Sequence, residues 1–291
     1  MDITFEAGDV TLVGSLTRPT GMRTRRPGVV IAHGFPSVPG GASFATQPLI
    51  PLGERITSTL GWSVLTFPFR GCGQSGGNFS LEGWLVDLLA AVERLHTEPL
   101  VEAVWLAGFG TGGALSICAA AEDPRVVGVA TLGAPAGFED WASHPRRLLE
   151  FARETEVIRQ SKFPASFERW ASGLRRVRPL SCIGDIRDRP LMVIHGTEDT
   201  SVPLLDAREL VDEHGAAEFR YISGASHDLR IDPRAIAVLL GWLDRQWTRR
   251  HATGRPNPPH PVAQPSSAPA DAVPSPPAEH PPPVLPPPTL L

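Results

Sequence analysis

A glycine-rich turn between two apolar segments is the feature that most constrains this fold. Residues 103–107 are typical of a buried strand, and residues 114–121 are typical of a helix. Between these segments stand Gly108, Gly110, Gly112 and Gly113. Parallel strands need a crossover connection, which is usually a helix, so a strand that turns directly into a helix predicts a parallel α/β fold.

The same glycines fit G-x-G-x-x-G, the pattern of a dinucleotide-binding turn. That pattern expects an acidic residue at the end of the next strand, about 20 residues further on, to bind the ribose. The next apolar run, residues 126–131, continues into Leu132-Gly133-Ala134-Pro135 without Asp or Glu. Several strand patterns also precede the turn, whereas a dinucleotide-binding turn normally opens its domain. We therefore expect no nucleotide cofactor.

Strand and helix patterns alternate through residues 1–250. An opening hairpin is expected around Ala7-Gly8-Asp9. Further strands are expected at 28–32, 63–67, 190–194 and 217–222, and helices at 51–60, 81–95, 205–214 and 233–249. Ser80 is the expected N-cap of helix 81–95, which should expose Glu82, Asp87 and Glu93 to solvent. Such alternation predicts a mostly parallel central sheet with helices on both faces.

Residues from about 137 to 185 interrupt this alternation with helical patterns at 141–155 and 167–176. We expect them to form a short helical cap over the carboxyl ends of the strands, where such sheets bind ligands. The segment from His144 to Arg178 holds nine Arg or Lys against four Glu. This excess could attract an acidic ligand, although a solvated helix face explains it more simply.

Four short motifs, followed in the same order along the chain, carry a family resemblance. They are His33-Gly34-Phe35, Arg70-Gly71-Cys72-Gly73-Gln74-Ser75, the segment from His195 to Pro203 that contains Asp199, and Gly224-Ala225-Ser226-His227. Together they resemble the α/β-hydrolase superfamily over about residues 1–250. The resemblance implies that fold.

The resemblance also implies roles for particular residues. Asp199 would be the acid and His227 the base of a catalytic triad, in the family's order of nucleophile, acid and base. The backbone amides of Phe35 and Thr111 would form the oxyanion hole. His33 is expected to be structural. We expect Asp199 and His227 to lie within hydrogen-bond distance, about 2.6–3.2 Å.

Gly110 decides between mechanisms. The frame Gly108-Phe109-Gly110-Thr111-Gly112 resembles the family's G-x-S-x-G, with glycine in place of the nucleophilic serine. Glycine accepts the positive φ of such a turn without strain, but it has no attacking oxygen. The N-myc downstream-regulated proteins are a similar case. The sequence therefore predicts an esterase-like pocket that is not an efficient serine hydrolase, possessing instead the role of binding a small ligand or a partner.

Two alternatives remain open. In the first, His227, oriented by Asp199, acts as a general base on water or on a carbon acid. In the second, an esterase uses Cys72 or Thr111 as its nucleophile. Ser116, more than one turn further along the helix, is expected to have only a packing role.

Composition narrows the other function classes. The chain has 27 Lys and Arg against 31 Asp and Glu, a net charge of −4, which favours neither nucleic acid nor an anionic membrane as a partner. Its three cysteines lack C-x-x-C spacing, so we expect no metal site, no disulfide framework and a cytoplasmic location. Residues 251–291 hold about half of the 31 prolines and are expected to form a disordered tail.

Overall fold

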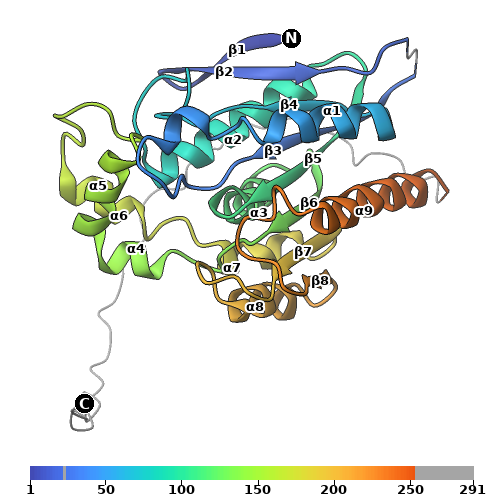
Figure 1. Cartoon of the computed structure of the whole chain (residues 1–291). Helices are drawn as coiled ribbons and strands as arrows, with labels where there is room; N and C mark the ends of the chain where they lie inside the picture. Colours follow the sequence, from blue (N-terminus) through green and yellow to red (C-terminus); the bar gives the residue numbers. More distant parts are fainter. Residues whose placement is uncertain (22–23, 253–291) are drawn as a thin grey trace, which may run out of the picture. The chain divides into compact units, whose positions relative to one another are not determined.

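The computed structural model describes residues 1–21 and 24–252, which contain an eight-stranded sheet (Figure 1). Its strands are β1 (Asp2–Ala7), β2 (Val10–Thr17), β3 (Arg26–Ala32), β4 (Ser63–Thr66), β5 (Val101–Phe109), β6 (Val126–Leu132), β7 (Leu191–Gly196) and β8 (Glu218–Ile222). Their order is β1-β2-β4-β3-β5-β6-β7-β8. β2 pairs antiparallel with β1 and β4, and every other pair is parallel. The expected mostly parallel sheet is confirmed.

Helices cover both faces of this sheet, because successive side chains of a strand point to opposite faces. The helices that pack on it are α1 (Leu49–Leu60), α2 (Leu81–His96), α3 (Thr111–Glu122), α8 (Leu204–His214) and α9 (Pro233–Ala252). Val30 and Ala32 of β3 belong to one apolar core with α2, α3 and α8. Val29 and Ile31 belong to a second core with α1 and α9. The two cores hold the sheet between two helical layers.

Short helices form most of the segment between β6 and β7. They are α4 (Glu139–Ser143), α5 (Pro145–Glu154), α6 (Phe167–Gly173), α7 (Pro179–Cys182) and the 3-10 turn η2 (Ile183–Ile186); a further 3-10 turn, η1 (Gly41–Phe44), follows β3. The single helix expected over 141–155 was wrong. It is divided at His144, because Pro145 has no N–H to continue α4 and is well suited to the first position of a new helix.

The α2 helix corrects a second expectation. Ser80 caps it as expected, since its Oγ accepts a hydrogen bond from Gly83 N–H at 3.1 Å. Asp87, which we expected to be exposed, has a fully buried side chain. It accepts hydrogen bonds from the backbone N–H, Nε and Nη2 of Arg70 at 2.8, 2.9 and 2.7 Å. A buried carboxylate is tolerated when it is paired in this way, and charge alone therefore misassigned its side of the helix.

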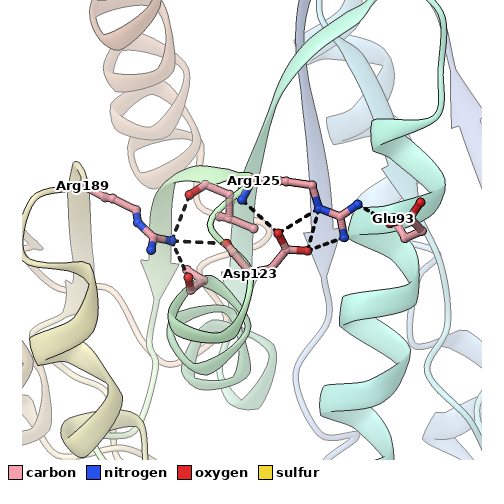
Figure 2. Close-up of polar contacts among 6 residues, drawn as sticks. Glu93, Asp123, Arg125 and Arg189 are labelled. Carbon is pink, nitrogen blue, oxygen red and sulfur yellow. Dashed lines mark hydrogen bonds and ion pairs between the residues drawn. The ribbon is translucent and has the colours of Figure 1, made fainter. Parts of the chain in front are cut away.

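One arginine fixes the edge of the sheet that lies away from Gly110. Arg189 precedes β7, and its Nη1 donates to the carbonyls of Ala120, Asp123 and Val126, the latter two at 3.3 and 3.1 Å (Figure 2). The last carbonyls of a helix have no partner within it, so this guanidinium satisfies the end of α3. Val126 opens β6, whereas Gly110 follows β5, and the two strands are parallel. The staple and Gly110 therefore lie at opposite ends of the strands.

Candidate functional site

Gly110 occupies a sharp turn between β5 and α3. Its φ is 51° and its ψ is −123°, and its N–H donates to the carbonyl of Leu132 on β6 at 2.8 Å. A side chain at this positive φ would be strained, so glycine suits the position. At Gly112 a Cβ atom would lie 2.4 Å from the carbonyl oxygen of His33. The start of α3 therefore packs directly on the backbone that follows β3.

Asp199 and His227 are joined by a hydrogen bond. His227 Nδ1 lies 2.8 Å from Asp199 Oδ2, and the aspartate side chain is fully buried while that of His227 is 38% exposed. Asp199 Oδ1 accepts the backbone N–H groups of Ser201 and Val202, each at 2.9 Å. Burial, the largest influence, favours a raised pKa, but the hydrogen bonds from His227, Val202 and Ser201 together hold the pKa of Asp199 below its ordinary value. The carboxylate is thus ionised and held in one orientation.

The imidazole of His227 faces the turn at Gly110. A Cβ atom on Gly110 would lie 3.5 Å from His227 Nε2. A Cβ atom on Gly133 would lie 3.4 Å from Nδ1 and 3.5 Å from Asp199 Oδ2. The backbone of two glycines therefore borders the two ring nitrogens. A side-chain oxygen at position 110 would come within reach of Nε2, and glycine supplies none.

Phe35 and Thr111, the expected amide donors, both lie beside Gly110. Thr111 is the first residue of α3, and the first N–H groups of a helix have no partner within the helix. Phe35 follows Gly34, where a Cβ atom would lie 3.7 Å from the Cα atom of Gly110. Amides placed here would face a carbonyl or carboxylate oxygen bound above the glycine turn.

His33 has the structural role expected of it. Its side chain is fully buried, its Nδ1 lies 2.7 Å from the carbonyl of Gly34, and its Nε2 accepts the N–H of Phe69 at 3.1 Å. A carbonyl can only accept, so Nδ1 carries the proton. Burial lowers the pKa of His33 to about 4, which keeps the ring neutral at pH 7. The ring fixes the loop that presents Phe35.

Cys72 is poorly suited to be a nucleophile. It is fully buried, and burial raises the pKa of its thiol above the ordinary value. Arg159 of the cap closes the glycine loop around it, because its Nη2 donates to the carbonyls of Gly71 and Gly73 at 2.7 and 2.9 Å. The thiolate is the reactive form of cysteine. The structure therefore gives no support to attack by Cys72.

Two hydroxyl residues of α3 also lie near the turn. Thr111 is buried and stands one helical step, about 100°, from the direction of residue 110. Ser116 is fully buried, and its Oγ donates to the carbonyl of Gly112 at 2.7 Å. The packing role expected of Ser116 agrees with this contact.

A groove of about 430 Å³ lies between α4 and α5, with Trp141 and Phe151 in its lining. The ring of Phe35 contacts both, with centroid distances of 5.2 Å to Trp141 and 5.8 Å to Phe151. It also packs edge-on against Phe79 at 5.0 Å. Phe35 thus connects the groove to the loop beside Gly110. Sequence reasoning missed these contacts, although the aromatic residues at 141 and 151 in the cap were a visible signal.

The charged side chains that line this groove are mainly acidic. They are Asp140, Glu150, Glu154 and Arg147. Of the nine basic residues counted in the cap, Arg147 alone contributes to the lining. Others bind backbone carbonyls elsewhere: Arg159 closes the glycine loop, and Arg175 Nη2 donates to Ala142 at 3.0 Å. The basic excess is therefore not gathered at the groove.

Within residues 1–21 and 24–252, no cluster of three or more His, Cys, Asp or Glu has the arrangement of a metal site. The part of the chain that the structure describes also has no helix with the length and apolarity needed to cross a membrane. The expected tail, residues 251–291, lies almost entirely outside the described residues.

Comparison with known proteins supports the fold. A family model described as "Alpha/beta hydrolase family" matches residues 29–239. Est1E from Butyrivibrio proteoclasticus with bound ferulic acid is 18% identical, with a TM-score of 0.66 over 86% of this chain and 99% of its own. The α/β hydrolase GrgF from Penicillium sp. sh18 is 20% identical, with a TM-score of 0.66 over 87% and 99%.

The esterase domain of a Rhodothermus marinus protein is also similar. It is 25% identical, with a TM-score of 0.62 over 86% of this chain and 98% of that domain. No curated protein sequence matches the chain.

Proposed function

Because the chain belongs to the alpha/beta hydrolase family and has glycine at position 110, we propose that it binds a small carbonyl or carboxylate ligand without forming an acyl-enzyme. The observation that carries the proposal is the contact between His227 and an empty side-chain position, with Nε2 only 3.5 Å from a Cβ atom on Gly110. The base and its aspartate are in place, and the oxygen that they would activate is absent. Acyl transfer through residue 110 has no nucleophile.

The head of the ligand would lie against the amides of Phe35 and Thr111. Backbone N–H groups at a helix start favour an oxygen that carries partial or full negative charge. The adjacent imidazole of His227 supplies a further donor when it is protonated. These groups support a carbonyl or carboxylate head more than a cationic one.

The body of the ligand would be aromatic or apolar. Trp141 and Phe151 line the groove, and both contact the ring of Phe35. Aromatic rings favour edge-to-face or offset contacts with further rings. That the similar esterase Est1E binds ferulic acid, an aromatic carboxylic acid, supports this choice of ligand class.

Isothermal titration calorimetry with benzoate, and with acetate as the matched ligand without a ring, tests the proposal. We expect benzoate to bind the wild-type protein at least about 10-fold more tightly than acetate, a difference of about 1.4 kcal/mol. Trp141→Leu should reduce that preference. Equal affinity for the two anions would contradict an aromatic-lined carboxylate pocket.

Hydrolysis of p-nitrophenyl acetate and labelling by a fluorophosphonate test the missing nucleophile. We expect the wild-type protein to react with neither at the rate of a serine esterase. Rapid turnover by the wild type would contradict the proposal and would direct attention to another nucleophile.

A second candidate function rests on the same geometry. Glycine leaves space next to His227 Nε2 for a water molecule, and Asp199 holds the ring through Nδ1. His227 is therefore placed to act as a general base on water or on a carbon acid. Slow ester turnover that survives Gly110→Ala but disappears in His227→Ala would favour this candidate over simple binding.

A further inference from the structure

A second imidazole lies behind Asp199. His195 is on β7 and is fully buried. Its Nε2 lies 3.0 Å from the carbonyl of Val202 and 3.6 Å from Asp199 Oδ2. Both neighbours are acceptors, so Nε2 carries the proton and donates it chiefly to Val202. The tautomer of His195 is set by these two oxygens.

The other nitrogen of the same ring is unsatisfied. Within the described residues, His195 Nδ1 is a buried acceptor without a hydrogen-bond partner. A buried polar atom without a partner is costly, and a position that only filled the core would be occupied at lower cost by an aliphatic residue. What the imidazole adds is the N–H on Nε2, at the point where the acidic loop needs a donor.

The hydrogen bonds around Val202 form a closed circuit. Val202 N–H donates to Asp199 Oδ1 at 2.9 Å, while its carbonyl accepts from His195 Nε2. His195 thereby anchors the turn whose amide holds one carboxylate oxygen. The other oxygen, Oδ2, is left facing His227 Nδ1 at 2.8 Å.

We propose that His195 is a positioning residue for Asp199, which fixes the turn at residues 199–202 so that Oδ2 points at His227. The proposal rests on the Asp199–His227 pair of the proposed function, although its main test requires no catalysis. His195 acts through Asp199, since its printed contacts are to Val202 and Asp199 and not to the position above Gly110.

The ring tautomer of His227, measured by ¹H–¹⁵N NMR in the full chain, is the main readout. In the wild type, Asp199 should hold the proton on His227 Nδ1. His195→Leu removes the donor and should give a mixture of the two tautomers, whereas His195→Gln keeps a donor at similar reach and should restore the wild-type form. Val193→Ala, also on β7, is the matched control: it leaves a core cavity but should not change the tautomer.

The labelling rate offers a second readout in the Gly110→Ser background. His195→Leu should slow the bond-forming step of fluorophosphonate labelling about 10-fold with little change in reagent binding, and His195→Gln should recover most of the rate. An unchanged His227 tautomer in a folded His195→Leu protein would overturn the proposal. If Gly110→Ser is not labelled at all, the proposed pocket fails and the tautomer measurement alone decides the role of His195.

Discussion

Asp199 and Asp87 both have fully buried carboxylates, yet the two regions treat them differently. Asp87 is paired with Arg70, whose side chain is only 14% exposed, and burial outweighs this pairing, so the pKa of Asp87 is raised. Asp199 is paired with His227, which is 38% exposed, and hydrogen bonds outweigh burial, so its pKa is lowered. The first pair is enclosed by the fold, and the second ends at an accessible ring.

This difference separates a structural pair from a functional one. Arg70 has no free edge directed to a ligand, because its Nε and Nη2 bind Asp87 and Nη2 also lies 3.3 Å from the carbonyl of Ala7. His227 instead uses only Nδ1 for Asp199 and presents Nε2 to the space over Gly110. Burial alone would not tell these two carboxylates apart. The exposure of the partner does.

The largest expected effect comes from completing the open pair. In Gly110→Ser the new hydroxyl should lie near His227 Nε2 and be activated by it. We expect fluorophosphonate labelling to rise on the order of 10⁴-fold, short of the roughly 10⁶-fold that an evolved triad loses without its serine. Positive φ at residue 110 should lower the free energy of unfolding by about 1 kcal/mol. Labelling kinetics and urea unfolding measure the two effects.

The control for this variant is Gly110→Ser combined with His227→Ala, which should not be labelled. A folded Gly110→Ser protein that stays unlabelled would show that the space over residue 110 is closed or that His227 is misplaced. Binding of a ligand elsewhere on the fold would then become the leading interpretation.

Breaking the enclosed pair should have the next largest effect. Asp87→Ala leaves the Arg70 guanidinium buried without its partner, and such losses cost about 3–5 kcal/mol of folding free energy. Asp199→Ala should cost less, since His227 is more exposed and can be solvated. Urea unfolding of the two variants measures this difference. A larger loss for Asp199→Ala would reverse our assignment of the structural and functional pairs.

The sequence allowed more of the fold than of the site to be predicted. Periodicity located the strands because side chains of buried strands are apolar on both faces, as in residues 126–131. It failed at Asp87, because a carboxylate on a helix reads as exposed unless its partner, 17 residues away, is known. It also gave no sign of His195 Nε2, since the contact with Val202 depends on a turn that no local pattern specifies.

The amino-terminal edge of the sheet offers a comparison with a purely structural arginine. Arg189 serves three carbonyls near the end of α3, and Arg125 joins Asp123 to Glu93 of α2 beside it (Figure 2). Arg189→Met should lower the free energy of unfolding by about 1.5–3 kcal/mol, because hydrogen bonds to a charged group are lost. Benzoate affinity should not change, since this edge lies opposite Gly110. A change in affinity at full folding would show that the two ends of the sheet are coupled.

The smallest expected effect, and the most direct test of the comparison, is the pH dependence of the two carboxylates. The lowered pKa of Asp199 means that its contribution to stability is present above the ordinary aspartate value of about 3.9 and is lost as pH falls through the folded-state pKa. The raised pKa of Asp87 has the opposite sign, because the folded protein takes up this proton first and gains stability as pH falls from the raised value toward about 3.9. Urea unfolding of the wild type, Asp199→Asn and Asp87→Asn between about pH 6 and pH 3 isolates each term, since the other carboxylates cancel in the differences. The advantage of the wild type over Asp199→Asn should shrink on acidification, while its advantage over Asp87→Asn should grow. Differences that change with the same sign would mean that both aspartates are held by one balance of burial and hydrogen bonding, and the exposure of His227 would then no longer distinguish the functional pair.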